Sequence, residues 1–344
     1  MNLSLLIPIL APSLASDIGV PVLIIGAMGL AFGLLLAFAS KVFAVTRDPR
    51  VEEIISVLPG ANCGGCGKAG CAGYAEAIVL QGAPVNLCTP GGPKVAQEIA
   101  KIMGTEAEAM VKKIAVIHCS TGGKDNTKWK YDYRGIETCL SAVNIAGGPN
   151  SCSWGCVGFN DCLNACKFDA ISVDESGMRI IDIEKCTGCG ACVKACPRKL
   201  IDLISIQHNV FIKCSSKDKG PLARQVCGTN QPCIGCGICV KKCPQQAITM
   251  ANNLASIDYS KCIDCGVCAA VCPTNAILDT LKGTRKKSEI DAELCDGCHI
   301  CVPVCAVGAI KGEENQKHSI DQDKCIGCGV CITVCPKNAI KTKE

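Results

Sequence analysis

The chain has 344 residues, of which 32 are cysteine and only 3% are aromatic, so a conventional core of large side chains is excluded. Cysteine at this density is typical of a disulfide scaffold or of a metal protein, and the spacing of the cysteines has to distinguish the two. The formal charge of +4 alone does not indicate a nucleic-acid partner. The sequence has neither a nucleic-acid-binding motif nor a basic stripe interleaved with aromatic residues, so nucleic-acid binding is not expected.

The first element is an uncharged apolar stretch from Pro21 to Ala39, which is long enough to cross the hydrocarbon core of a bilayer as one helix. Asp17 precedes this stretch and no Lys or Arg does, whereas Lys41, Arg47 and Arg50 follow it directly. Positive residues collect on the cytoplasmic side of membrane spans. The pattern therefore predicts one span whose C-terminal end faces the cytoplasm.

We expect residues 1–46 to form a membrane anchor, with the span at about residues 21–44 and the bulk of the chain on the cytoplasmic side of the cytoplasmic membrane. The alternative is a cleaved secretory signal, but the stretch lacks a basic start and is longer than the apolar core of a signal. The cysteines favour the anchor as well, because the reducing cytoplasm keeps thiols free to bind metal.

Close behind the anchor lies a constellation of four cysteines, with spacings of two, four and sixteen residues: Cys63, Cys66, Cys71 and Cys88. Four thiolates are sufficient to bind one iron–sulfur cluster. The segment VEEIISVL before Cys63 has the apolar spacing of a short helix. We therefore predict a small domain over residues 47–113 that holds one [4Fe–4S] cluster close to the membrane.

An internal repeat organises the rest of the chain. Five segments have the spacing C-x2-C-x2-C-x3-C, and they begin at Cys186, Cys233, Cys262, Cys295 and Cys325. A sixth, divergent copy with longer loops contains Cys152, Cys156, Cys162 and Cys166. A single C-x2-C would fit zinc equally well, but five copies in register leave little room for zinc or for disulfides. The repeat therefore indicates [4Fe–4S] clusters.

In the bacterial ferredoxin pattern, three thiolates of a motif bind one cluster and the fourth ligates the other cluster of a pair. This crossing rule assigns three pairs. The first pair takes Cys152, Cys156, Cys162 and Cys196 for one cluster and Cys186, Cys189, Cys192 and Cys166 for its twin. The second pair takes Cys233, Cys236, Cys239 and Cys272, and then Cys262, Cys265, Cys268 and Cys243. The third pair takes Cys295, Cys298, Cys301 and Cys335, and then Cys325, Cys328, Cys331 and Cys305. Runs such as PQQAITM after each fourth cysteine predict a turn and then a strand.

Four cysteines remain after seven clusters are filled: Cys119, Cys139, Cys214 and Cys227. The segments KIAVIHCSTGGK and NVFIKCSSKDKG each contain an apolar strand followed by Cys-Ser and a polar turn, which indicates a duplication. Two interpretations stay open. The four thiols either converge on an eighth cluster, carried by two strands that flank the same middle domain, or they are buried free thiols.

The predicted fold class is α+β, with an N-terminal transmembrane helix, a small Fe–S domain and three tandem two-cluster ferredoxin-like domains. After the anchor and the four-Cys domain, the predicted boundaries are residues 114–230 for the first pair and its Cys-containing strands, 231–280 for the second pair, 281–290 for a solvated basic linker and 291–344 for the third pair. The motifs of the first pair lie within residues 152–205.

The predicted cofactors are seven [4Fe–4S] clusters, or eight with the remaining cysteines. Each oxidised four-thiolate cluster carries about −2, so seven of them bring the formal charge of the protein to about −10. We find no phosphate-binding glycine loop, no nucleotide-binding fingerprint and no placed acid–base pair. The sequence thus predicts no bound flavin or nucleotide and no catalytic residue, but an electron carrier.

With these features in view, the chain resembles the B subunit of the Rnf complex, a membrane ion-pumping oxidoreductase that links ferredoxin to NAD. The resemblance covers nearly the whole length and rests on the anchor, on FAVTRDPRVEEIISVLPGANCGGCGKAGCAGYAEAI, on CTPGG from Cys88 and on the repeats. Three pairs correspond to the long, polyferredoxin form of the family.

The resemblance implies that the chain relays electrons between soluble ferredoxin and the flavin and iron–sulfur subunits in the membrane, with other integral and peripheral subunits as partners and with Na⁺ or H⁺ pumped by the whole complex. Two alternatives belong to other classes. One is a polyferredoxin subunit of another membrane enzyme, such as a hydrogenase or a formate-oxidising complex. The other is an exported protein held together by disulfides, which the positive flank of the span opposes.

Overall fold

A computed structural model of the protein describes residues 7–43, 48–123 and 125–343, and for residues 7–17 the backbone alone. The chain divides into two compact units, Met1–Val51 and Glu52–Glu344. The first contains the N-terminal helix and the second contains all the cysteines.

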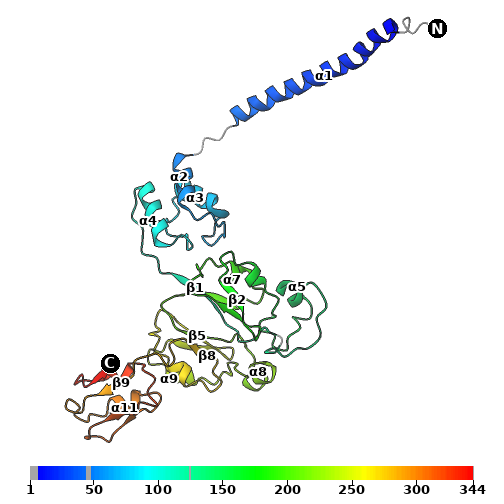
Figure 1. The fold of residues 1–344 in the computed structure, drawn as a ribbon. Coiled ribbons are helices and arrows are strands. Elements are labelled where there is room, and N and C mark those ends of the chain that lie inside the picture. The colour runs from blue at the N-terminus through cyan, green and yellow to red at the C-terminus, as the bar shows by residue number, and fades with distance from the viewer. Residues whose placement is uncertain (1–6, 44–47, 124, 344) are drawn as a thin grey trace. The chain divides into compact units, whose positions relative to one another are not determined.

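The first unit contains one long helix, α1, which spans Ile7–Val42 (Figure 1). Its segment Ile18–Val42 is 25 residues long, has a mean hydropathy of 2.5 and buries none of its surface against the rest of the protein. A helix that is apolar on every face and covered by nothing needs a non-aqueous surrounding, so its length and composition suit a membrane span. The ends of the predicted anchor, residues 1–6 and 44–46, lie outside the described residues.

The start of the second unit is helical and holds Cys63, Cys66, Cys71 and Cys88 in its loops. Its helices are α2 (Pro49–Val57), α3 (Gly70–Gln81) and α4 (Gly92–Met103). The helix predicted for VEEIISVL is thus confirmed. Tyr74 is buried, and its hydroxyl donates to the carbonyl of Pro84 at 2.7 Å and accepts from the N–H of Leu87 at 3.0 Å. These two bonds fix the loop that leads to Cys88.

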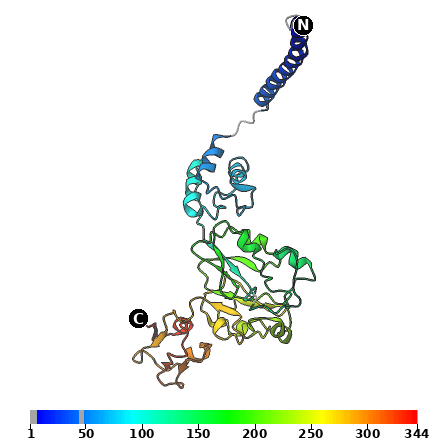
Figure 2. The same cartoon turned by 45° about the vertical axis from the view of Figure 1, so that its right-hand side comes forward.

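The remainder of the second unit repeats one topology three times. In each copy the first strand pairs antiparallel with the last, namely β1 (Lys113–Ile117) with β4 (Ile201–Ser205), β5 (Val210–Ile212) with β8 (Ile277–Asp279), and β9 (Ser288–Ile290) with β12 (Ile340–Thr342). Between them lies a hairpin, formed by β2 (Ile171–Val173) and β3 (Arg179–Ile181), by β6 (Ile248–Ala251) and β7 (Leu254–Ile257), or by β10 (Ile310–Lys311) and β11 (Ser319–Ile320). The third copy contains the C-terminal end of the chain (Figure 2).

Short helices carry the third cysteine of each motif. They are α6 (Asp161–Asn164), α7 (Ala191–Ala195), α9 (Ile238–Lys242), α10 (Val267–Ala270), α11 (Cys301–Val304) and α12 (Val330–Val334). Two more helices, α5 (Cys139–Asn144) and α8 (Gly220–Val226), lie in the segments that precede the first and second pairs of motifs. These segments have no counterpart in the third copy, in which Cys295 follows β9 after four residues.

The turn and strand predicted after each fourth cysteine are confirmed in all six motifs. The strand begins at an isoleucine five residues after that cysteine, at Ile171, Ile201, Ile248, Ile277, Ile310 and Ile340. All six isoleucines are buried, and so is the residue before each of them, which is Ala in five motifs and Leu200 in the other. These side chains pack with the cysteines, so each pair has a small core of aliphatic and cysteine side chains.

One predicted grouping is wrong. From the sequence we expect the NVFIK strand to belong to the first pair, within residues 114–230. In the structure this strand is β5, and it pairs with β8 of the second pair, where the two lie side by side (Figure 1). The boundary between the first and second pairs therefore falls between Ser205 and Val210, because each pair needs its own first strand to close its sheet.

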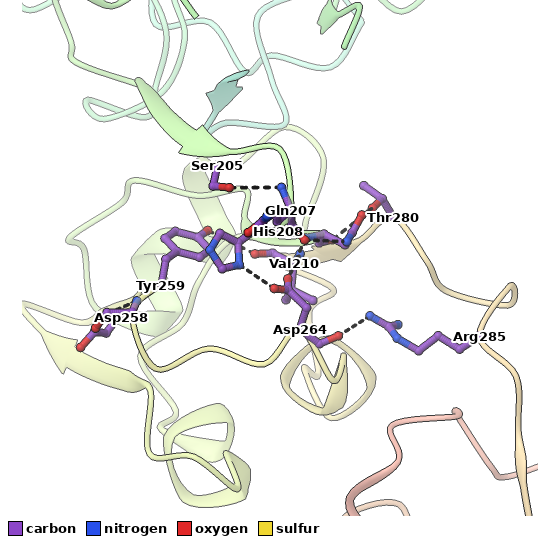
Figure 3. A network of polar contacts seen from close by, with 11 residues as sticks. Ser205, Gln207, His208, Val210, Asp258, Tyr259, Asp264, Thr280 and Arg285 are labelled. Atoms are coloured by element: carbon purple, nitrogen blue, oxygen red, sulfur yellow. Dashed lines mark hydrogen bonds and ion pairs between the residues drawn. The ribbon is translucent and has the colours of Figure 1, made fainter. Parts of the chain in front are cut away.

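A polar network closes the second pair around the loop between Cys262 and Cys265 (Figure 3). Asp264 accepts from the backbone N–H groups of Asn209 and Val210, at 2.7 and 3.1 Å, and lies 2.6 Å from Nδ1 of His208. Arg285 donates to the carbonyl of Asp264 at 2.6 Å and forms a buried ion pair with Asp279. The predicted linker is therefore not fully solvated, because Arg285 is folded into the second pair.

Candidate iron–sulfur sites

In four of the six motifs, the fourth cysteine lies in a turn that aims a backbone donor at its sulfur. The residue three positions later has a positive φ, as in Gln246 (48°) and Asn275 (53°). This conformation turns the next N–H toward the thiol, so that Ala247 donates to Sγ of Cys243 and Ala276 to Sγ of Cys272, both at 3.3 Å. The same bond forms at Cys196 and Cys305. A donor to sulfur stabilises a thiolate and influences the potential of a cluster bound to it.

Four cavities each bring together one set of cysteines that the crossing rule groups. The Cys186 site is lined by Cys186, Cys189, Cys192 and Cys166. The Cys233 site is lined by Cys233, Cys236, Cys239 and Cys272. The Cys262 site is lined by Cys262, Cys265, Cys268 and Cys243. The Cys295 site is lined by Cys295, Cys298, Cys301 and Cys335. In each of the four, the fourth thiol thus comes from the other motif of the pair.

In two further sets, the thiols are close enough to influence one another's pKa. The pKa of Cys331 is raised first by burial and then by the thiolates of the other members of the Cys325 site, which are Cys325, Cys328 and Cys305. The pKa of Cys88 is raised in the same order by burial and by the rest of the Cys63 site, which comprises Cys63, Cys66 and Cys71. Each set is therefore close enough for its members to interact.

The first pair departs from its predicted ligand set. Its cavity is lined by Cys156, Cys162 and Cys196, as expected, but also by Cys139 and Cys119, and not by Cys152. Burial raises the pKa of Cys162, and the nearby Cys139 thiolate raises it further. Of the four leftover cysteines, Cys119 and Cys139 thus both line the cavity of the first pair, and Cys139 is the one whose charge acts on Cys162.

The chemistry of these sets suits iron–sulfur clusters. The thiols line apolar cavities, and burial raises the pKa of Cys239 and Cys301 to about 11 and that of Cys268 and Cys192 to about 12. Iron must therefore displace a proton from each thiol when it binds. Among the residues described, no three Cys, His, Asp or Glu side chains converge on a position for one metal ion. Thiols spread around a cavity suit a multi-iron cluster.

Thiols of successive sites also lie close to one another. Burial has the larger effect on the pKa of these thiols, but the charge of a thiolate in one set also raises the pKa of a thiol in the next set. The pairs that interact in this way are Cys63 and Cys189, Cys162 and Cys192, Cys239 and Cys268, Cys328 and Cys265, and Cys331 and Cys301. The sites therefore form two rows, one from the Cys63 site to the first pair and the other from the second pair to the third.

Two lysines hold residues 61–66, the Cys63 loop, against the first pair, and neither contact was predicted from the sequence. Lys167 donates to the carbonyl of Ala61 at 3.0 Å, and Lys194 donates to that of Gly64 at 3.0 Å. A Cβ on Gly65 would lie 2.6 Å from the carbonyl oxygen of Cys189, so glycine is required there. Lys167 occupies the position where four of the six motifs have proline, and that departure was the available signal.

Two other polar pairs lie at the sites of the first and third pairs. In the third pair, Nδ1 of His299 lies 3.0 Å from Nε2 of the buried His318, whose Nδ1 is 4.0 Å from Sγ of Cys295. In the first pair, Arg179 donates to Asn160 Oδ1 at 2.9 Å and to the carbonyls of Gly122 and Gly177. These contacts fix the loops that carry the ligands.

Family comparisons agree with this arrangement. A putative Fe–S cluster family matches residues 58–90. One 4Fe-4S dicluster family matches residues 152–201 and 232–276, and a second 4Fe-4S dicluster family matches residues 255–311 and 288–342. Four cysteines lie outside these ranges: Cys119 and Cys139 before the first pair of motifs, and Cys214 and Cys227 before the second.

Three relatives are similar over most of their length. The B subunit of the Na⁺-translocating ferredoxin:NAD⁺ oxidoreductase complex of Acetobacterium woodii is 47% identical over 70% of this chain and 72% of its own. The B subunit of an ion-translocating oxidoreductase complex of Methanosarcina acetivorans is 42% identical over 59% and 77%. The B subunit of the proton-translocating ferredoxin:NAD⁺ oxidoreductase complex of Clostridium ljungdahlii is 42% identical over 68% and 81%.

Proposed function

Because the chain belongs to the B-subunit family of ion-translocating ferredoxin:NAD⁺ oxidoreductase complexes, we propose that it relays electrons between soluble ferredoxin and the flavin and iron–sulfur subunits in the membrane. It is an iron–sulfur electron-transfer subunit with several [4Fe–4S] clusters. The other subunits of such a complex are its partners.

The observation that carries the proposal is the succession of cysteine sets along the chain. A [4Fe–4S] cluster supplies the ability to accept and release one electron. The protein keeps successive sets close, through Cys63 and Cys189 at one end of the second unit and through Cys328 and Cys265 toward the other. We propose that ferredoxin docks at the third pair, where Cys298 is exposed, and that the Cys63 site delivers electrons to the membrane subunits.

The ferredoxin end can be tested in the intact complex with the full chain. We expect Cys298→Ala to abolish NAD⁺ reduction driven by reduced ferredoxin, because it removes a ligand of the outermost site. A small reduced viologen can reach other sites, so the rate that it drives should persist in the same variant. An unchanged ferredoxin-driven rate, with the Cys295 site shown to be empty by iron analysis, would place the entry point elsewhere.

The membrane end depends on α1. We propose that α1 spans the cytoplasmic membrane once and that the second unit lies in the cytoplasm, as the positive residues after the span favour. Trypsin should then cleave the chain at its basic residues in inverted membrane vesicles and leave it intact in right-side-out vesicles. Cleavage in right-side-out vesicles alone would reverse this orientation.

A further inference from the structure

We propose that Cys119, Cys152, Cys214 and Cys227 bind an eighth [4Fe–4S] cluster between the first and second ferredoxin pairs, and that Cys139 takes the place of Cys152 in the first pair. We call the new set the bridging site. The set in the first pair, which we call the Cys139 site, then comprises Cys139, Cys156, Cys162 and Cys196.

Cys119 and Cys214 are brought together by a reciprocal clasp between the two duplicated Cys-Ser segments. Ser215 donates from its hydroxyl to the carbonyl of His118 at 2.9 Å, and Ser120 donates to the carbonyl of Lys213 at 3.3 Å. Each serine thus binds the residue that precedes the cysteine of the other segment. Nδ1 of His118 adds a contact of 2.6 Å to the carbonyl of Ile212. The duplication seen in the sequence therefore builds one half of a four-thiol site.

Cys152 is held toward this clasp and away from the first-pair cavity. The indole N–H of Trp154 donates to Asp218 at 3.2 Å, and the ammonium of Lys217 lies 4.9 Å from the centre of the Trp154 ring. The Trp154 loop is thereby attached to the chain just after Cys214. The pKa of Cys152 is raised to about 11, first by burial and then by the thiolates of Cys119 and Cys227.

Cys227 reaches the same point through Lys128. The ammonium of Lys128 donates to the carbonyl of Gln225 at 2.8 Å, and its own carbonyl accepts from the N–H of Ser151 at 2.7 Å. One residue thus ties the chain before Cys227 to the chain before Cys152. A Cβ on Gly228 would lie 2.0 Å from the carbonyl oxygen of Asn126, so the contact requires glycine after Cys227.

Cys139 is held in the first pair by a helix cap. The carboxylate of Asp161 accepts from the N–H of Cys139 at 2.9 Å and from that of Leu140 at 3.2 Å, at the start of α5. Asp161 directly precedes Cys162, so the cap brings Cys139 next to a member of the first pair. Burial raises the pKa of Cys139, and the Cys196 thiolate contributes as well. The two sets meet where the N–H of Cys156 donates to Sγ of Cys119 at 3.3 Å.

The bridging site would join the two rows of sites described above. The pKa of Cys214 is raised to about 12, first by burial and then by the thiolates of Cys233, in the second pair, and of Cys119. Toward the first pair, the guanidinium of Arg198 donates to the carbonyl of Cys152 at 3.1 Å. Its positive charge offsets the negative charge of the nearby cysteine thiolates. This linking role rests on the relay proposed above, whereas the presence of the cluster does not.

Cluster content can be counted on the full chain, purified in detergent without oxygen. Eight clusters require about 32 iron atoms per chain and seven require about 28, together with as many sulfides. We expect native mass spectrometry and chemical analysis of the wild-type protein to give the higher number. A wild-type value at the lower number would refute the bridging site without any variant.

Pairs of substitutions test which cysteine belongs to which site. Cys214→Ala should lose about four irons. Adding Cys152→Ala should cause no further loss, because both residues serve the bridging site, whereas adding Cys139→Ala should remove about four more. The opposite result for the two additions would restore the grouping predicted from sequence. No loss in Cys214→Ala would mean that the four are free thiols.

The linking role has a separate readout. In the intact complex, Cys214→Ala should lose NAD⁺ reduction driven by ferredoxin, while the clusters of the second and third pairs are still reduced by ferredoxin in electron paramagnetic resonance spectra. If the iron count supports the bridging site and the rate is unaffected, the cluster is present but is not part of the relay. If the clusters of the third pair are themselves not reduced by ferredoxin in the wild-type complex, the proposed function fails and the site assignment stands.

Discussion

The first and third ferredoxin pairs share one topology and differ in what comes between the first strand and the first motif. In the third pair, four residues separate β9 from Cys295, and the motif has the regular spacing. In the first pair, residues 118–151 intervene between β1 and Cys152, and the motif itself is longer. The hairpin, the closing strand and the turn after each fourth cysteine are the same in both. An insertion ahead of a motif therefore leaves the scaffold intact, and in the ligand assignment proposed above it also exchanges one ligand.

The two pairs also place different non-glycine residues at one position that has a left-handed backbone conformation. Asn160 and His299 both have a positive φ, 64° and 62°, two residues before the third cysteine, where the other four motifs have glycine. Asn160 is bound by Arg179, and His299 is bound by His318. Arg179 and His318 occupy the same position in their hairpins, two residues before the isoleucine that pairs with Ile171 or Ile310. In the second pair the corresponding residues are Gly237 and Ala255, and no such bond is needed.

The largest effects should come from ligands that cross between motifs. We expect Cys196→Ala to empty the Cys139 site and Cys335→Ala to empty the Cys295 site, at a loss of about four irons each. Adding Cys162→Ala to Cys196→Ala should cause no further loss of iron, whereas adding Cys189→Ala should remove about four more. If Cys189→Ala were the silent addition, Cys196 would serve its own motif and the two pairs would not share the crossed arrangement.

Next in size is the loss of the polar clamp. Replacing Arg179 with Met removes charged hydrogen bonds to several carbonyls and to Asn160, which we expect to cost about 3 kcal/mol of stability. His318→Ala in the third pair removes the contact with His299 and the longer contact with Cys295, and should cost about 1 kcal/mol. Urea-induced bleaching of the iron–sulfur absorption, followed for each variant, measures both. Equal shifts would mean that the insertion of the first pair does not depend on Arg179.

A smaller effect is expected where the left-handed residue is changed. His299→Gly relieves a strained backbone conformation, which stabilises the protein by about 1 kcal/mol, and loses the hydrogen bond to His318, which costs about the same. The stability of this variant should therefore be close to that of the wild type. Asn160→Gly gains less, because asparagine tolerates this conformation, and it removes the side-chain acceptor of Arg179, which keeps only its carbonyl partners. We therefore expect Asn160→Gly to be the more destabilising of the two in the same urea experiment, and the reverse order would contradict this account.

The smallest effect concerns Lys167, which occupies the position of Ala306 in the third pair. Lys167→Ala should weaken the attachment of the Cys63 loop by about 0.5 kcal/mol, because its hydrogen bonds are exposed to water. Hydrogen exchange at residues 61–66 should become faster, and Lys101→Ala in α4 provides a control of equal charge. Equal exchange in the two variants would show that Lys167 does not hold the loop.

The parts of the fold that could be predicted from the sequence are those fixed by short-range patterns. The turn after each fourth cysteine and the buried isoleucine that starts the strand recur at a constant distance, so one repeat predicts all six. The same regularity predicted the four crossed sets of cysteines that each line one cavity. Tight loops leave few ways to arrange three thiols around a cluster.

What escaped prediction depends on contacts between distant parts of the chain. Both Cys139 and Cys152 precede Cys156, and only the path of the insertion, with Trp154 bound to Asp218 and α5 capped by Asp161, separates them. The partner of β5 lies more than sixty residues further along, at β8. Local patterns carry no information on such pairings, although the repeated strand before each pair was a signal that each pair needs its own.

The pairing of the first strand with the last has a consequence for how the protein is made. In each pair the sheet remains open until its last strand has been synthesised, and all the motif cysteines of a pair lie between its first and last strands. A cell must therefore protect the thiols of a pair, or load them with iron, while its sheet is still open.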